Sequence, residues 1–463
     1  MRTQGRPKVA LVPYPAQGHV TPMVQLASAL NRLGFQPVLI NPQFIHSQLS
    51  CTAVSEDDGN VVMFMSIPDG LDDDQPRDFF AISHFMENIM PLHLDQLLRS
   101  FDSRAEGLAF VVVDLLASCA ISVAERCRIP VVGFWPAMYA TYTIVKAIPD
   151  FIQKRLISAI DGSPLTEETV GFLPSLPGLN PTHCPWLVGN ATSRLFRFKF
   201  WLATLKRVAS LKWILFNSFP EENQRQQQPS LSIAEPVVSP EPVVSPEPSL
   251  FHVGPLTRHI EHNPSMWEED NSCTVWLAKQ VSGSVIYVSF GSWVGLSLQQ
   301  HIVELAIALE ASERPFLWVL RTAWQAKLPT GFLESVGRRG KVVDWAPQRE
   351  VLESKAVGCF LTHCGWNSTV EAIIAGKPLL CWPVSGDQFV NCEFIVNVWK
   401  VGIQLEGEER EDIRKGLAMK MSHWQELKKN MLALRKRVFG IDGELTAMKN
   451  LISFTQAVMN GKA

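Results

Sequence analysis

The sequence predicts an α/β protein built from two Rossmann-like domains that face each other across a cleft. Short apolar runs of strand length alternate with helical segments in the N-terminal part of the chain, and a second series of the same kind begins at Ser284. Strands that alternate with helices are typical of parallel sheets, whose ligands bind at the carboxyl ends of the strands. The length of 463 residues is also enough for two or three domains of about 150 residues.

The first series opens with a strand, a loop, a helix and a second strand. Residues 8–13 are expected to form a buried strand, and a loop over 15–19 leads to a helix that begins at Thr21 and Pro22. A hydroxyl side chain can cap a helix, and proline is tolerated in its first turn. The next strand is expected over 38–41. Later elements of this series are strands over 109–113, 130–134 and 213–217, with a helix over 119–127.

The second series repeats this pattern. A strand over 285–290 runs into Gly291 and Ser292, and helical periodicity follows over 298–311. Further strands are expected over 316–321, 341–344, 359–362 and 378–383. We therefore predict a second parallel sheet in the C-terminal half.

A proline-rich segment interrupts the first series before the second begins. Residues 224–250 contain Glu-Pro-Val-Val-Ser-Pro twice in succession. Such a repeat cannot build a core, so an extended surface loop is expected. The polar and charged residues 257–275 are the expected linker. This division gives an N-terminal domain over 1–256 and a C-terminal domain over 276–445.

The composition excludes several classes of function. A formal net charge of −3 argues against a general polyanion binder, and so against a nucleic-acid partner. The nine cysteines include no Cys-x-x-Cys pair, which gives a structural zinc site little support and suits a reducing compartment. The apolar run over 9–12 is too short for a signal peptide, and no run of about 18 apolar residues occurs. We expect a cytoplasmic protein without a membrane span.

The most informative stretch is 345–388. Within it, Thr362 ends an expected strand and a helix follows, for which Asn367 and Ser368 are candidate caps and Glu371 completes a capping box. Backbone N–H groups at such a terminus carry partial positive charge and suit a diphosphate. An ordinary capped helix is the structural alternative, because capping boxes are common.

Two other phosphate-binding loops are absent from the sequence. No Gly-x-Gly-x-x-Gly follows an early strand, which disfavours a dinucleotide cofactor, and Gly376-Lys377 is followed by Pro378 where a Walker loop needs Ser or Thr. A Gly-x-Ser-x-Gly elbow is absent as well, so serine hydrolysis has little support.

The 44 residues over 345–388 resemble the signature box of plant UDP-dependent secondary-product glycosyltransferases, from Trp-Ala-Pro-Gln through His-Cys-Gly-Trp-Asn-Ser to Asp-Gln. Other segments that look like landmarks of this family lie over 15–19, 216–219, 253–256 and 288–292. The resemblance implies the GT-B architecture, with a C-terminal helix over 446–463 that returns to the N-terminal domain. It also implies a UDP-sugar donor, a small-molecule acceptor and no metal or other cofactor, and we expect a monomer.

The resemblance further implies a role for individual donor-site residues. Trp345 stacks on uracil, the backbone of Ala346 binds its edge, and the ribose hydroxyls are held by Gln348 and Glu371. The residues implied around the diphosphate are Ser292, His363, Asn367 and Ser368. Those implied at the sugar are Trp366, Asp387 and Gln388. Sugar hydroxyls need both donors and acceptors, and in this family a terminal Gln such as Gln388 goes more often with glucose.

The expected catalytic pair is His19 and Asp114. An inverting transfer needs a base for the acceptor proton, which histidine supplies near neutral pH, and a carboxylate behind it can fix the tautomer. His19 is placed on the loop after the first strand, and Asp114 ends a later strand of the same sheet. A lone histidine is more often structural, but the Pro-x-x-Gly-His loop and the resemblance assign His19 the base and Asp114 its partner.

The sequence departs from the family at two positions and leaves the acceptor open. Cys119 stands where relatives often carry a bulky aromatic, and 440–444 lacks their Gly-Gly-Ser-Ser stretch. The acceptor pocket is expected mainly in the N-terminal domain. The candidates for its apolar wall are Phe85, Phe134, Trp135, Met138 and Tyr139, and each of them can equally be an ordinary core residue. We expect glucose transfer from UDP-glucose to a phenolic, terpenoid or hormone. The alternatives are a nucleotide-sugar-binding protein without turnover and, less favoured, an NAD-dependent oxidoreductase.

Overall fold

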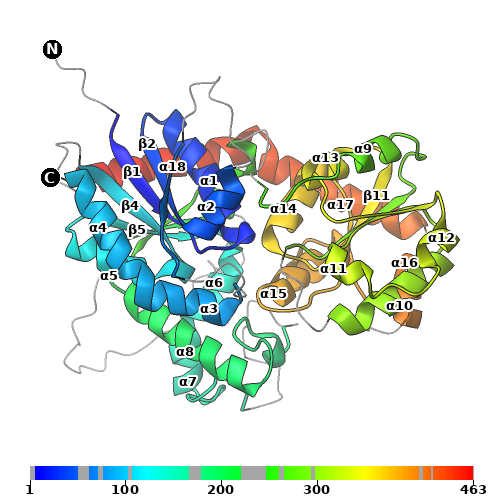
Figure 1. Cartoon of the computed structure of the whole chain (residues 1–463), viewed down its shortest axis with the longest axis horizontal. Coiled ribbons are helices and arrows are strands. Elements are labelled where there is room, and N and C mark those ends of the chain that lie inside the picture. Colours follow the sequence, from blue (N-terminus) through cyan, green and yellow to red (C-terminus); the bar gives the residue numbers. More distant parts are fainter. Residues whose placement is uncertain are drawn as a thin grey trace, which may run out of the picture. The chain divides into compact units, whose positions relative to one another are not determined.

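The computed structural model describes residues 6–50, 62–70, 77–102, 107–165, 179–219, 247–259, 265–292, 298–405, 410–418 and 421–461. The chain divides into two compact units. The first comprises residues 1–146, 199–266 and 445–463, and the second comprises residues 147–198 and 267–444. Each unit contains one parallel sheet, and Figure 1 labels strands β1, β2, β4 and β5 of the first sheet and β11 of the second.

The sheet of the first unit has seven strands in the order β3-β2-β1-β4-β5-β6-β7. Every pairing in it is parallel, and Leu11 of the inner strand β1 lies opposite Leu39 of β2 and Val112 of β4. The strands are β1 (Lys8–Val12), β2 (Gln36–Pro42), β3 (Met63–Ile67), β4 (Leu108–Asp114), β5 (Val131–Trp135), β6 (Trp213–Phe216) and β7 (Ser249–His252). Continuous apolar runs suit β1 and β4 because strands covered on both faces have no solvent side.

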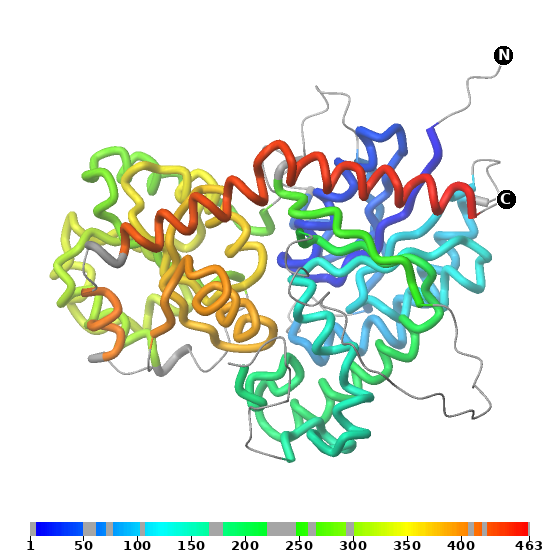
Figure 2. Tube along the Cα trace, turned by 180° about the vertical axis from the view of Figure 1, so that it is seen from behind, coloured from blue at the N-terminus to red at the C-terminus, as the bar shows by residue number. Residues whose placement is uncertain are grey.

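Helices cover this sheet and end with a long C-terminal helix. Phe454 of α18 (Ile441–Asn460) packs edge-on against Phe110 of β4 and Phe251 of β7, and Asn450 donates a hydrogen bond of 2.8 Å to the carbonyl of His252. Figure 2 shows α18 in red along the strands of this unit. The other helices are α1 (Gln17–Arg32), α2 (Gln43–Ser50), α3 (Phe79–His84), η2 (Phe85–Ile89), α4 (Met90–Asp102), η3 (Leu115–Ala117), α5 (Cys119–Arg126), α6 (Tyr139–Lys146), η6 (Leu256–His259) and the second half of α8 (Ala191–Val208).

The second unit repeats the architecture with six parallel strands in the order β10-β9-β8-β11-β12-β13. The strands are β8 (Val285–Ser289), β9 (Phe316–Val319), β10 (Gly340–Val343), β11 (Val357–Thr362), β12 (Leu379–Cys381) and β13 (Gly402–Gln404). The helices are α7 (Ile148–Gln153), η4 (Pro181–His183), α9 (Ser272–Leu277), α10 (Leu298–Ala311), α11 (Thr322–Gln325), α12 (Phe332–Val336), α13 (Gln348–Glu353), α14 (Trp366–Ala375), α15 (Gln388–Glu393), η7 (Phe394–Val398), α16 (Arg410–Leu417) and α17 (Met421–Phe439).

Both sheets reverse their strand order beside the first strand of the unit. In the first unit the reversal lies between β1 and β4, and in the second it lies between β8 and β11. Loops that leave neighbouring strands in opposite directions open a crevice at the carboxyl ends of those strands, where ligands of such sheets bind. The two Rossmann-like domains of the GT-B architecture are thereby confirmed.

The start of the first helix differs from the prediction. The helix α1 begins at Gln17, and His19 N and Val20 N both donate to the carbonyl of Ala16, so His19 lies in the first turn of α1 and not on a loop. Thr21 is not its cap: it is inside the helix and accepts from Gln17 Nε2 at 2.9 Å. Pro22 also lies inside the helix, where it removes one backbone hydrogen bond but does not end α1.

The capping box expected at Ser368 and Glu371 is also wrong. The cap of α14 is Gly365, and no side chain caps this helix. Ser368 therefore lies inside the first turn, and the Ser368 hydroxyl and the Glu371 carboxylate both accept hydrogen bonds from Gln348.

Two further expectations concern a membrane span and the proline-rich segment. Of the helices in the described part of the chain, none combines the length and the apolar character that a membrane span requires. The proline-rich segment lies mostly outside the described residues.

Candidate active site

His19 and Asp114 meet at the reversal point of the first sheet. The loop after β1 leads into the first turn of α1, which carries His19, while Asp114 is the last residue of the adjacent strand β4. Nδ1 of His19 lies 2.7 Å from Oδ2 of Asp114. The predicted catalytic residues are thus in direct contact, although 95 positions apart in the chain.

The carboxylate of Asp114 is fixed before it meets the imidazole. Its side chain is fully buried, and Oδ1 accepts a hydrogen bond of 2.9 Å from the backbone N–H of Leu116 at the start of η3. Since the other oxygen faces Nδ1 of His19, that nitrogen carries the hydrogen and donates it. Nε2 is then the nitrogen that can accept a proton. The His19 side chain is 22% exposed, and its ring lies 5.1 Å from that of Tyr14.

The second unit gathers the predicted donor-site residues at the carboxyl ends of its strands. Ser292 follows β8, Trp345 and Ala346 follow β10, His363 follows β11, and Asp387 and Gln388 lie beyond β12. Trp366, Asn367, Ser368 and Glu371 all lie on α14, the helix that continues from β11. The strands thus bring together residues that lie far apart in the sequence.

Gln348 ties three elements of this site together. The Tyr287 hydroxyl on β8 donates to Gln348 Oε1 at 3.0 Å, and Gln348 Nε2 donates to Ser368 Oγ at 2.8 Å and to Glu371 Oε2 at 2.7 Å. The two residues assigned to the ribose, Gln348 and Glu371, are therefore hydrogen-bonded to each other. Their shared network holds the start of α13 against α14.

His363 packs closely against Gly291 and Gly365, and neither position has room for a side chain beside the imidazole. A Cβ atom would lie 2.8 Å from His363 Nε2 if added at Gly291, and 2.4 Å from it if added at Gly365. Gly291 also has a φ of +73°, where other residues are strained. Burial lowers the pKa of His363 to about 4, and the backbone of Ser289 opposes this shift only in part. The imidazole is therefore neutral at pH 7 and can donate one N–H.

The N-terminus of α14 is built to receive an anion. Its cap, Gly365, has no side chain to occupy the N–H groups of the first turn. Those groups belong to Trp366, Asn367 and Ser368, directly beside His363. Uncapped N–H groups at a helix terminus, together with the helix dipole, favour a negatively charged ligand.

The residues assigned to the sugar differ in how they are held. Asp387 Oδ2 accepts from Asn391 Nδ2 at 3.0 Å. Gln388 Oε1 accepts from the backbone N–H groups of Val384 and Ser385 at 2.9 and 3.0 Å, which leaves the amide NH₂ as the donating end. Trp366 is only 4% exposed and packs against Trp399, so little of its indole can reach a ligand.

Comparison with known proteins decides the family. The model of the family described as UDP-glucoronosyl and UDP-glucosyl transferase matches residues 252–437. UDP-glycosyltransferase 82A1 of Arabidopsis thaliana is 44% identical over 461 residues, which cover 97% of this chain and 98% of the relative. The chain belongs to the plant UDP-glycosyltransferases.

Two further relatives resemble this glycosyltransferase along almost its whole length. The (R)-mandelonitrile beta-glucosyltransferase of Prunus dulcis is 29% identical, with 92% of this chain and 90% of the relative covered. The structure of Phytolacca americana UGT2 complexed with UDP-2fluoro-glucose and pterostilbene superposes with a TM-score of 0.77 at 26% identity and covers 98% of this chain and 99% of that chain.

An aromatic and charged group beside Trp345 was not predicted from the sequence. The rings of Trp267 and Trp345 lie 4.5 Å apart at an angle of 42°, and the Arg321 guanidinium lies 5.2 Å from the Trp267 ring. Arg321 also pairs with Asp344 at 2.6 Å. A pocket of this glycosyltransferase borders the group and is lined by Phe290, Gly291, His301, Trp318, Arg321 and Trp345. Asp344 directly precedes the signature box, but nothing in the sequence indicates that it pairs with Arg321 or that Arg321 lies over Trp267.

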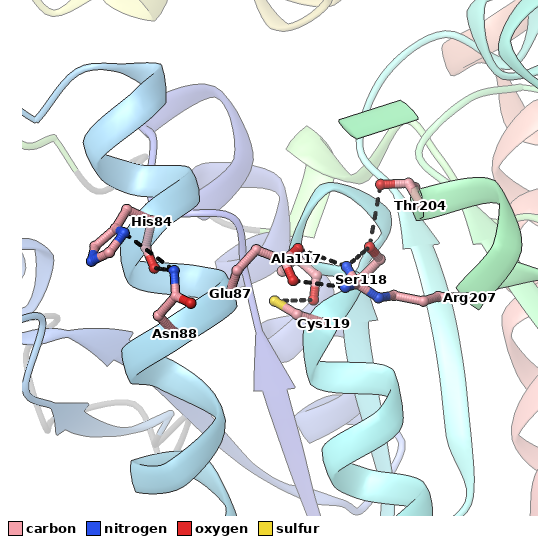
Figure 3. Close-up of polar contacts among 8 residues, drawn as sticks. All are labelled: His84, Glu87, Asn88, Ala117, Ser118, Cys119, Thr204 and Arg207. Carbon is pink, nitrogen blue, oxygen red and sulfur yellow. Dashed lines mark hydrogen bonds and ion pairs between the residues drawn. The ribbon is translucent and has the colours of Figure 1, made fainter. Parts of the chain in front are cut away.

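Polar groups surround the unusual cysteine of this glycosyltransferase. Figure 3 shows Arg207 of α8 beside Glu87 of η2, with both hydrogen bonds at 2.7 Å, and Ser118 between Arg207 and Thr204. Burial, and then the charge of Glu87, raises the pKa of the Cys119 thiol to about 12, so this thiol is not a nucleophile.

The side chains proposed as an acceptor wall belong to the core of the first unit. Phe85, Phe134, Trp135 and Met138 are each at most 3% exposed. Tyr139 is half-buried and packs edge-on against Phe216 and His252. The alternative of ordinary core therefore describes the four buried side chains, and only Tyr139 keeps surface.

Proposed function

We propose that this enzyme transfers glucose from UDP-glucose to a hydroxyl group of a small lipophilic acceptor and inverts the anomeric carbon to give a β-glucoside. The observation that supports this most is the contact of 2.7 Å between His19 and the buried Asp114. The names of two relatives point the same way, one to beta-glucosyl transfer and one to a bound UDP-fluoroglucose with a phenolic acceptor. The plausible acceptors are phenolics, terpenoids or hormones.

In the proposed reaction His19 is the general base. As the acceptor oxygen attacks the anomeric carbon, its proton passes to Nε2, and the ring becomes an imidazolium whose Nδ1–H points at the Asp114 carboxylate. A fixed carboxylate stabilises this cation and holds the productive tautomer. General-base catalysis of this kind contributes on the order of 10²–10⁴ to the rate.

The departing UDP takes the electron pair of the broken carbon–oxygen bond. We assign its stabilisation to the first-turn N–H groups of α14 and to the neutral His363, together with Ser292, Asn367 and Ser368. Preorganised donors of this sort stabilise developing negative charge without needing a metal ion. Trp345 and Ala346 are assigned to uracil, Gln348 and Glu371 to ribose, and Asp387, Gln388 and Trp366 to glucose, Trp366 through its backbone.

The direct test is product detection by mass spectrometry. Purified protein is incubated with UDP-glucose and a panel of phenolics, terpenoids and hormones, beside His19→Ala. New hexosides that disappear in the variant support the proposal. UDP-glucose binding without any hexoside from a broad panel would favour a nucleotide-sugar-binding protein without turnover. We further propose that the enzyme works as a cytoplasmic monomer, without a cofactor, a nucleic-acid partner or a membrane span, which size-exclusion chromatography and cell fractionation would check.

A further inference from the structure

Three buried cysteines converge behind the proposed donor site. Cys364 follows β11, Cys381 ends β12, and Cys392 lies on α15. Each offers one sulfur, and the three Sγ atoms all lie within 4.8 Å of one another. None of the three residues is more than 1% exposed, and all three are reduced. Three elements thus point soft donor atoms at one small volume in the core of the second unit.

The cluster lies in the core of the second unit, where all three cysteine side chains are buried. Thiolates are soft ligands, and the binding of a metal ion itself ionises the thiols that hold it. A thiolate that is buried together with a metal cation is a paired charge, and so it avoids the cost of an isolated buried charge.

The geometry also matches a sulfur-ligated ion. A metal–sulfur bond of about 2.3 Å places the sulfurs of a tetrahedral or trigonal site about 4 Å apart. The observed spread of at most 4.8 Å therefore needs only small rotations of the side chains to close. Thiolate ligands select soft ions, chiefly Zn²⁺ and Cu⁺.

We propose that Cys364, Cys381 and Cys392 form a binding site for one thiophilic d¹⁰ metal ion, Zn²⁺ or Cu⁺. Binding of the ion joins three thiolates to the metal, and each cysteine that was a thiol beforehand releases its proton to solvent. The ion takes no part in sugar transfer. It holds the loop after β11, the end of β12 and α15 together, and so stabilises the second unit.

The cluster is connected to Asp387 through one side chain. Asn391 Nδ2 donates to the carbonyl of Cys364 at 2.9 Å and to Asp387 Oδ2 at 3.0 Å. Helix α15 then continues into the π-helical turn η7, a geometry that is often found at functional sites. An effect of the ion on UDP-glucose affinity is a consequence that rests on the proposed function, whereas the metal site itself does not.

The experiment uses Cd²⁺ as a spectroscopic probe. The full-length protein is reduced, freed of metal and equilibrated with Cd²⁺, and the sulfur-to-cadmium charge-transfer absorption is titrated. The expected result is one ion per chain in this band, and a higher melting temperature. Cys381→Ser and Cys392→Ser should each lose the band. Cys359→Ser, which removes an equally buried thiol of β11 outside the cluster, should keep it. Displacement of Cd²⁺ by Zn²⁺ or by Cu⁺ under anaerobic conditions then identifies the preferred ion.

Two results of the titration would overturn the metal site. One is wild-type protein without the band; the other is a band that persists undiminished in Cys381→Ser and Cys392→Ser. Circular dichroism checks that the variants fold. X-ray absorption of Cd²⁺-loaded wild-type protein needs no variant, and should count three sulfur neighbours. Oxygen and nitrogen neighbours alone would also reject the site. Because none of these measurements uses turnover, failure here is distinguishable from failure of the proposed glucosyl transfer.

Discussion

The reversal points of the two sheets carry different kinds of site. Between β1 and β4 the first unit concentrates its chemistry in two side chains, His19 and Asp114, which contact each other directly. Between β8 and β11 the second unit distributes the groups assigned to the donor over a helix terminus, two glycines and a network of amides and hydroxyls. The same topology thus supports one site that should fail at a single substitution and one that should weaken by steps.

The largest effect is expected at the concentrated site. His19→Ala removes the proposed base and should lower kcat by on the order of 10²–10⁴, while the affinity for UDP-glucose stays unchanged because every assigned donor contact lies in the second unit. Steady-state kinetics and calorimetric titration measure the two quantities. His93→Ala, on α4 of the same unit, is the control and should behave as wild type. Equal losses of donor affinity and of kcat in His19→Ala would contradict the division between a catalytic site in the first unit and a donor site in the second.

A smaller effect is expected where a glycine approaches His363. Gly365→Ala places a Cβ atom 2.4 Å from His363 Nε2 and must push the ring away. The backbone of Gly365 has a φ of −59°, which alanine adopts freely, so the clash alone is tested. We expect KM for UDP-glucose to rise about tenfold, equivalent to about 1.4 kcal/mol. An unchanged KM would remove His363 from the diphosphate site.

A substitution of one amide in the hydrogen-bond network of the second unit should reduce UDP-glucose affinity less than the Gly365 substitution does. Gln348→Ala deletes the hydrogen bonds to Tyr287, Ser368 and Glu371. We expect a several-fold weaker UDP-glucose affinity and a loss of unfolding free energy of about 1–3 kcal/mol. Arg349→Ala removes an exposed ion pair with Glu353 and should change stability by less than about 1 kcal/mol. Denaturant unfolding and calorimetry would contradict the network if both variants matched wild type.

The substitution with the smallest expected effect on activity at neutral pH is at His252. Burial lowers the pKa of this histidine to about 4. The folded protein disfavours the protonated ring, so its contribution to stability is complete above pH 6.5 and is lost as the pH falls from 6.5 towards 4. The loss at pH 4 should be on the order of 2–3 kcal/mol. In His252→Phe the slope of unfolding free energy against pH over this window should be shallower. An identical slope would mean that His252 is not buried in its neutral form.

Much of the fold was predictable because buried parallel strands are continuous apolar runs. Strands such as β1, β4 and β8 were placed to within one residue at each end. The edge strands β3, β7 and β13 were not predicted, because none of the three carries a long apolar run. Strands β3 and β7 are partly exposed, and β13 has only three residues. The start of α1 was placed too late, because the sequence signal of Thr21 and Pro22 outweighed hydrogen bonds to Ala16 that only the structure shows.

The members of the candidate site were named from the sequence and the resemblance, but the hydrogen bonds between them were not predicted. Thirteen residues were assigned from a helix-terminus argument and a resemblance, but the hydrogen bonds of Gln348 replace the capping box that the sequence suggested. The contact of Trp267 with Trp345 was not predicted. The cysteine cluster could not be predicted, because Cys364, Cys381 and Cys392 have no metal-binding spacing and meet only once β11, β12 and α15 are packed.

The most direct test of the account is the anomeric configuration of the product, read by proton NMR from the coupling of the anomeric hydrogen. The donor sugar of UDP-glucose is α-linked, and a single displacement assisted by His19 must invert it. We predict a β-glucoside as the sole initial product. An α-glucoside would contradict the single displacement, and with it the role of the His19–Asp114 pair as the base that activates the acceptor.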